Sequence, residues 1–367
     1  TTVLTGEESN NVTKETQANI LNWCATEFKE ATNDLPRFSE IKSSETGRAC
    51  KQASLAFLGR TYMLMKEWAK GAETYKEIID LGDNDLHSKY SELFYPGTGV
   101  GNKENIYYIA YLENYFGCGL PQHGLSAKDG GWSLSNPTAG LFESYAFTDG
   151  TPFSYDDPRF NPDNLGENRD PRLKQCIYTP ERPIAILADG SEEYENSPVF
   201  SNLSNTGYRL YKMYSPLAED NEYIKCTLDD LIYRYGEVLL NYAEAKAELG
   251  ECDQAVLDKT INKLRDRVGM KHLTTDVGFT DPNWPNWEVP ISPLLNEIRR
   301  ERRVELACEG LRWNDLCRWK AGKLLENIKT YLGPRDPATG EYRVVYPGMT
   351  RTWYDRLYLY PIPTDEF

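Results

Sequence analysis

Helical periodicity occupies two parts of this 367-residue chain, residues 1–82 and 229–330. Apolar side chains recur there at spacings of three and four residues, which places an apolar stripe along one face of a helix. Residues 83–228 lie between them and are interrupted every few positions by Gly, Pro, Asn or Asp, a pattern that predicts loops. We therefore expect a mainly α fold with a helical scaffold, a loop-rich, irregular segment that faces a ligand, and an extended C-terminal segment at 331–367.

The periodicity predicts five long helices, at 48–66, 70–80, 229–249, 253–268 and 294–309. Residues 58–62 read LGRTY and are followed by Tyr75, which matches part of the tetratricopeptide pattern of paired helices. Gly59 would let the second helix of that pair approach closely. Residues 105–111 are the clearest strand candidate.

Charge and composition exclude several classes of function. With 41 basic and 56 acidic side chains, the net charge is −15, which argues against nucleic acid and against unaided binding to anionic lipid. The 25 tyrosines outnumber the 12 phenylalanines. Because a tyrosine combines an apolar ring with a polar end, this excess favours a binding surface, and sugars present matching apolar faces and hydroxyl rims.

The cysteines and histidines give no metal pattern. Eight cysteines are irregularly spaced without a C-x-x-C motif, and only three histidines accompany them. We expect free, partly buried thiols, and neither a metal nor a cofactor. Since the chain begins at Thr1 without a signal sequence, we also expect a processed or truncated product.

Residues 299–323 combine acidic and basic side chains on a predicted helix. Glu301, Glu305 and Glu309 share one helical face, and neighbouring carboxylates repel unless guanidinium groups lie between them. A glycosidase could use two such carboxylates as acid and base, but ion pairing would keep both ionised. We therefore expect an ion-pair lattice and no catalytic residue, with arginines nearby at 302, 303, 312 and 318.

The same segment, RRERRVELACEGLRWNDLCRWKAGK, closely resembles the signature helix of the SusD/RagB family, which comprises surface glycan-binding lipoproteins of Bacteroidetes outer membranes. Further matches follow the family's order. They are the early helix pair at 47–79, LFESYAFTDGTPF at 141–153, NRDPRL at 168–173, the late hairpin at 229–250 with 261–270, and LYPIPTDEF at 359–367. Together the matches extend over about residues 15–367.

The resemblance implies one SusD-like domain over residues 1–367 that lacks the family's N-terminal region and the end of its tail. It implies a protein without enzymatic activity that captures oligosaccharides or polysaccharides at the cell surface. The expected partner is a SusC-like TonB-dependent outer-membrane transporter, which imports the glycan. Attachment to the membrane would require a lipid anchor that is missing from this chain.

Two other functions remain open. One is a tetratricopeptide-like adaptor that binds a peptide or protein, including peptide capture of the RagB kind. The other is a carbohydrate-active enzyme, although neither a G-x-S-x-G motif nor a His-centred triad is evident in the sequence.

Candidate ligand residues concentrate in residues 111–135, where aromatic side chains alternate with glycines and polar groups. Sugar capture needs flat rings together with amide or other planar polar groups that bind hydroxyls. We expect an exposed aromatic surface formed by Trp132, Tyr115 and Phe116, with Asn114 or His123 at its rim. A second candidate is DPNWPNW at 281–287, which contains Trp284 and Trp287.

Overall fold

The computed structural model describes residues 5–9, 13–99, 101–124, 131–194, 205–282 and 290–360. Its α-helices are α1 (Gly6–Ser9), α2 (Gln17–Asp34), α3 (Lys51–Met65), α4 (Trp68–Leu81), α5 (Leu120–Gly124), α6 (Ala139–Phe142), α7 (Arg172–Cys176), α8 (Tyr235–Glu248), α9 (Gln254–Lys259), α10 (Ile261–Val268), α11 (Pro293–Glu305) and α12 (Arg312–Arg318). Its strands are β1 (Asn105–Ile109), β2 (Ala185–Ile186), β3 (Glu192–Glu193), β4 (Asp230–Arg234), β5 (Leu332–Arg335) and β6 (Tyr342–Val344).

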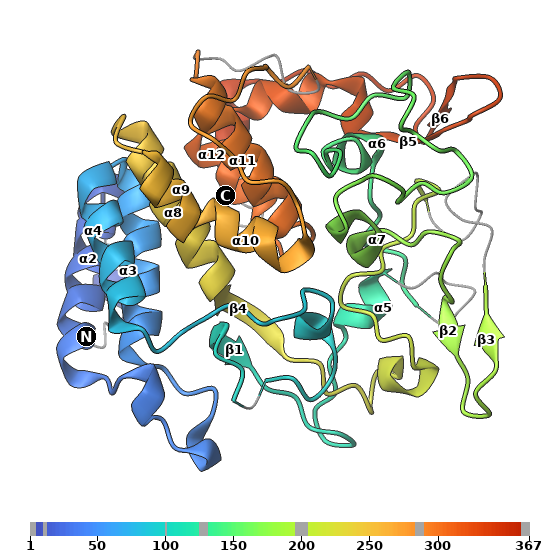
Figure 1. The fold of residues 1–367 in the computed structure, drawn as a ribbon. Coiled ribbons are helices and arrows are strands. Elements are labelled where there is room, and N and C mark those ends of the chain that lie inside the picture. The colour runs from blue at the N-terminus through green and yellow to red at the C-terminus, as the bar shows by residue number, and fades with distance from the viewer. Residues whose placement is uncertain are drawn as a thin grey trace.

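Helices α2, α3, α4 and α8 lie side by side, and α11 packs against α8 (Figure 1). The close approach expected at Gly59 is confirmed, because a Cβ there would lie 2.5 Å from the Tyr75 ring. Apolar side chains from both ends of the chain fill the space between these helices, as burial of apolar surface requires. This core contains Leu55, Ile78, Leu239, Leu240, Ile261 and Ile298.

Two of the expected helices differ from the structure, one at its start and one in its middle. Residues 230–234 form strand β4, which pairs antiparallel with β1, so the helix expected at 229–249 begins only at Tyr235. The helix expected at 253–268 is broken at Thr260, whose φ and ψ of −129° and −90° are not helical. The expected mainly α fold and the strand near 105–111 are confirmed.

The strands of the described residues form three separate two-stranded sheets, β1–β4, β2–β3 and β5–β6. The last of these lies within the extended C-terminal segment. No helix of the described residues is long and apolar enough to cross a membrane.

The loop-rich segment has a second, largely aromatic core, to which Val304 and Ala307 from the end of the α11 region also contribute. Phe142, Phe147, Phe153 and Tyr208 are buried together, and the Arg169 guanidinium lies 3.5 Å from the centre of the Phe153 ring, a favourable cation–π contact. The described part of residues 83–228 therefore packs around a buried interior.

Burial also corrects the interpretation of the tyrosine excess. Tyr75, Tyr90 and Tyr233 are each at most 2% exposed, and their hydroxyl groups bond inside the protein. Tyr90 donates to the Glu305 backbone oxygen at 2.8 Å, and Tyr233 to the Tyr75 hydroxyl at 3.1 Å. Many of the tyrosines therefore serve the interior, where their hydroxyls satisfy buried polar groups.

Candidate ligand-binding surface

The carboxylates of the signature helix lie inside the protein. Glu301 and Glu305 on α11 are both 0% exposed. Arg172 bridges them, with its Nη2 at 2.6 Å from a Glu301 oxygen and its Nη1 at 2.9 Å from a Glu305 oxygen. Arg265 of α10 adds a second bond to Glu301, at 2.9 Å. The expected ion-pair lattice is present.

The source of the arginines differs from the expectation. Glu305 binds Arg234, from the end of β4, at 2.7 Å and Arg267, from α10, at 2.5 Å. Both of these arginines also bind Glu104, which precedes β1. The lattice therefore joins the motifs that resemble the SusD/RagB family, although they are far apart in the sequence.

Two of the arginines expected beside these glutamates pair with other carboxylates. Arg302 binds Asp315 at 2.8 Å, and Arg318 binds Glu244 at 2.6 Å. Pairing within the helix was expected because residues four apart share a face. Neighbouring helices and loops provide closer and better buried partners for Glu301 and Glu305.

The lattice keeps its carboxylates ionised. Burial alone would raise the pKa of Glu301, but Arg172, Arg265 and Arg300 outweigh it and lower the pKa to about 2. The pKa of Glu305 is likewise well below its usual value, because Arg267, Arg234 and Arg172 outweigh its burial. A general acid needs a raised pKa and access to substrate. The arrangement of these two glutamates is that of structural ion pairs.

A different arrangement follows strand β1, where a tight turn carries three of the expected residues. The backbones of Leu112 and Phe116 exchange two hydrogen bonds of 2.9 Å. Asn114 sits in the left-handed region at φ 61°, which asparagine tolerates, and its N–H donates to the Ile224 oxygen at 2.9 Å. Tyr115 is 86% exposed and Phe116 62%. The turn thus holds two rings in solvent on an ordered backbone.

The remaining expected residues gather beside helix α5. The Trp132 N–H donates to the Gln122 oxygen at 2.7 Å, and its indole lies 5.2 Å from the His123 ring and 6.1 Å from the Tyr223 ring. Trp132 is 49% exposed and Tyr223 54%, while His123 is half-buried. A half-exposed indole braced by two rings is suited to stacking on a flat partner.

Residues 223–224 lie between the turn at 112–116 and the side chains beside helix α5. A Cβ on Gly117 would lie 1.9 Å from the Tyr223 backbone oxygen, so only glycine allows this close approach. A Cβ on Gly119 would lie 3.4 Å from both the Trp132 and the Tyr223 rings. We call the exposed side chains around this junction the aromatic surface: Leu112, Tyr115, Phe116, Trp132, Tyr223 and Ile224.

Tyr111, inside the candidate stretch 111–135, stacks on Phe116 with ring centres 5.0 Å apart. Sequence reasoning missed Tyr223, which comes from a segment about ninety residues after Trp132. No local pattern marks Tyr223, since only the fold brings it to Trp132. The second candidate group, Trp284 and Trp287, lies outside the described residues.

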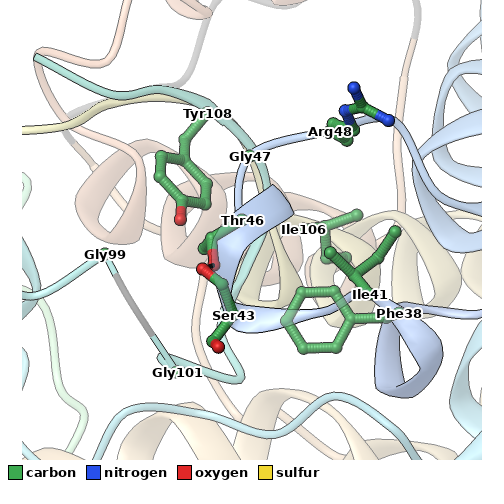
Figure 2. A pocket seen from close by; sticks show the side chains of 10 residues that line it. All are labelled: Phe38, Ile41, Ser43, Thr46, Gly47, Arg48, Gly99, Gly101, Ile106 and Tyr108. Atoms are coloured by element: carbon green, nitrogen blue, oxygen red, sulfur yellow. Dashed lines mark hydrogen bonds between the residues drawn. The ribbon is translucent and has the colours of Figure 1, made fainter.

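A separate cavity has a volume of about 210 Å³. Figure 2 shows the residues that line it, which come from 38–48, 99, 101, 106 and 108. Its walls include the rings of Phe38 and Tyr108 and are mostly apolar. The Thr46 hydroxyl already donates to a backbone oxygen at 2.7 Å, and Arg48 pairs with a neighbouring glutamate at 2.9 Å. The cavity therefore suits a ligand rich in hydroxyl groups less well than the aromatic surface does.

Comparison with known proteins assigns the family. A model of the SusD family matches residues 97–367, so the chain belongs to this family. A crystal structure of a SusD-like carbohydrate-binding protein from Bacteroides fragilis is 45% identical. The match has a TM-score of 0.81 and covers 99% of this chain and 72% of that one.

Two further relatives agree. A second SusD-like protein from Bacteroides fragilis is 27% identical with a TM-score of 0.75, over 99% of this chain and 71% of that chain. SusD-like protein P38 from Formosa agariphila is 25% identical over 81% of this chain and 56% of its own length. The chain spans about half the length of the curated relatives it matches.

Proposed function

We propose that this protein captures oligosaccharides or polysaccharides at the cell surface and binds them without turnover. The observation that carries the proposal is the aromatic surface, with Tyr115, Phe116 and Trp132 exposed on hydrogen-bonded backbone. A large exposed apolar patch on a soluble domain marks an interaction site. Membership of the SusD family and the similarity to a carbohydrate-binding protein support a glycan as the ligand.

The chemistry of the surface fits a sugar. Pyranose rings offer apolar C–H faces that stack on aromatic rings, while their hydroxyl groups need donors and acceptors at the edge. Asn114 is exposed beside Tyr115, and His123 lies against the Trp132 ring. These two side chains can hydrogen-bond a sugar whose faces rest on Trp132 or Tyr115.

The proposal extends to the protein's place in the cell. As a single SusD-like domain held at the outer membrane by a lipid, it delivers glycans to a SusC-like TonB-dependent transporter. The net charge of −15 supports the need for an anchor, because anionic lipid headgroups repel an acidic domain.

A panel of oligosaccharides tests the proposal directly. Purified protein is expected to bind at least one glycan class in an array and in calorimetry, without releasing reducing ends. Binding to peptides with no response to any glycan would favour the adaptor function. Release of reducing ends at a rate that Glu301→Gln abolishes would instead indicate a glycosidase.

A pull-down of the native lipoprotein tests the partner. We expect an outer-membrane barrel transporter to accompany it, whereas recovery of cytoplasmic proteins alone would contradict the proposed location.

A further inference from the structure

Cys118 and Cys226 lie against each other beneath the aromatic surface. The Cys118 N–H donates to the Cys226 backbone oxygen at 2.9 Å, which limits the separation of the two Cα atoms to about 7 Å or less. Disulfides span Cα distances of about 4.4–6.8 Å. Both thiols are free and buried in this structure, in one apolar cluster with Leu228, and the Cys226 thiol raises the pKa of the Cys118 thiol.

Lys212 brings Cys176 and Cys308 close together. Cys176 ends helix α7, and its backbone oxygen accepts the Lys212 N–H at 3.3 Å. The Lys212 Nζ donates to the backbone oxygen of Ala307, the residue before Cys308, at 2.9 Å, and each of the two thiols shifts the pKa of the other. Lys212 lies near Cys176, and its positive charge favours the thiolate that begins disulfide exchange. This pair is independent of the first, because it joins different segments.

We propose that Cys118–Cys226 and Cys176–Cys308 are disulfide sites. In each, a thiolate attacks the disulfide of a thiol–disulfide oxidant, and the second thiol then resolves the mixed disulfide. The pair loses two protons and two electrons, one S–S bond forms, and the oxidant is reduced to its dithiol. Contact with such an oxidant requires the location at the cell surface, so this part of the proposal rests on the proposed function. The thiol geometry does not depend on that location.

The two bonds would restrain the loop-rich segment at functionally different places. The first ties the residues just after Phe116 to the segment that carries Tyr223, and these two segments make up the aromatic surface. The second ties α7, which supplies Arg172 to the ion-pair lattice, to the end of α11. Each bond closes a loop of more than a hundred residues, and long loops give disulfides their largest effect on the unfolded chain.

Peptide mapping tests the proposal. The protein is exposed to oxidised glutathione, denatured with an alkylating reagent but no reductant, and digested with trypsin. We expect residues 104–128 linked to 226–234 and residues 175–209 linked to 304–312, with Cys24, Cys50, Cys252 and Cys317 alkylated as internal controls. Alkylation of all eight cysteines would overturn the proposal, and a single linkage would overturn it for the other pair.

Thermal unfolding provides a second readout for the Cys118–Cys226 bond. Cys118→Ser, Cys226→Ser and the double variant should each lower the Tm of the oxidised protein by about 5–10 °C and by the same amount, since either change removes the same bond. Cys24→Ser is the matched control and should leave the Tm unchanged. If the decreases in Tm were additive and persisted when all proteins are reduced, the two thiols would only pack against each other and the proposed bond would be wrong. If a variant fails to fold, peptide mapping of the parent protein decides whether the bond forms.

Discussion

The helical scaffold and the aromatic surface place charged and aromatic side chains in opposite ways. Around α11, carboxylates and guanidinium groups are buried and paired with distances of 2.5–2.9 Å at Glu301 and Glu305. Around Trp132 and Tyr115, large rings are exposed to solvent. Both arrangements are costly unless something compensates, since buried charges need partners and exposed rings need an occupant.

The difference separates the residues that hold the fold together from those proposed to bind the ligand. The sequence blocks that resemble the SusD/RagB family provide Arg172, Arg234, Arg265 and Arg267 to a single buried lattice. Their role is to hold the loop-rich segment against the scaffold. The proposed ligand residues lie in a stretch without such blocks.

The largest expected effect breaks the lattice. Glu301→Ala leaves Arg172 and Arg265 without their shared carboxylate and should cost about 3–5 kcal/mol of unfolding free energy, measured by urea denaturation. Glu222→Ala is the control, because Glu222 pairs with Lys225 at an exposed site and should change stability by about 0.5 kcal/mol or less. Similar small losses in both variants would contradict a stabilising lattice.

The lattice should also make the free energy of unfolding depend on pH. The pKa of Glu301 falls from its usual value near 4.5 to about 2 in the folded protein, so its contribution is complete above pH 4.5 and is lost as the pH falls towards 2. That shift corresponds to about 3 kcal/mol. Urea unfolding at several pH values should show the parent losing about this much more than Glu301→Gln over that range, whereas parallel pH profiles would rule out an ionised Glu301.

Alanine variants of two tryptophans allow a direct comparison of the aromatic surface with the helical scaffold. Trp132→Ala should weaken oligosaccharide binding about five- to two-hundredfold, since a stacked ring contributes about 1–3 kcal/mol, with little change in Tm. Trp319 is 8% exposed and its Nε1 donates to Glu244 at 2.5 Å, so Trp319→Ala should cost about 3–5 kcal/mol of stability without changing the affinity of the folded fraction.

Calorimetry and thermal melts of the two tryptophan variants decide between these roles. If Trp132→Ala lost stability and kept its affinity, Trp132 would be a packing residue, and Trp284 and Trp287 would become the next candidates.

Apolar periodicity was sufficient to predict helices of the scaffold, but not the strand pairing that joins the scaffold to the rest of the fold. Apolar periodicity correctly predicted most of α3, α4 and α11, because a helix is held by contacts within a few residues of each position. It failed at 230–234, where pairing with β1 overrides helical periodicity, as long-range contacts commonly override local propensity.

The candidate surface was predictable only in part, for the same reason. Tyr115, Phe116 and Trp132 are close in the sequence, and their density among glycines marked them. Tyr223 and the arginine partners of Glu305 come from distant segments, and no spacing rule within one segment could indicate them.

The smallest expected effect has the opposite pH dependence from the lattice. Asp229 lies against Gly99, and burial raises its pKa from 3.8 to about 6. The folded protein therefore binds a proton more tightly than the unfolded chain, so this residue lowers stability as the pH rises from about 4 to 6. Asp229→Asn, which carries no charge, should leave stability unchanged at pH 4 and raise it by about 1–2 kcal/mol at pH 7 after allowance for partial exposure to solvent. Thermal melts of both proteins across this range test the sign: a variant that is less stable than the parent at pH 7 would mean that the charged carboxylate has a stabilising partner.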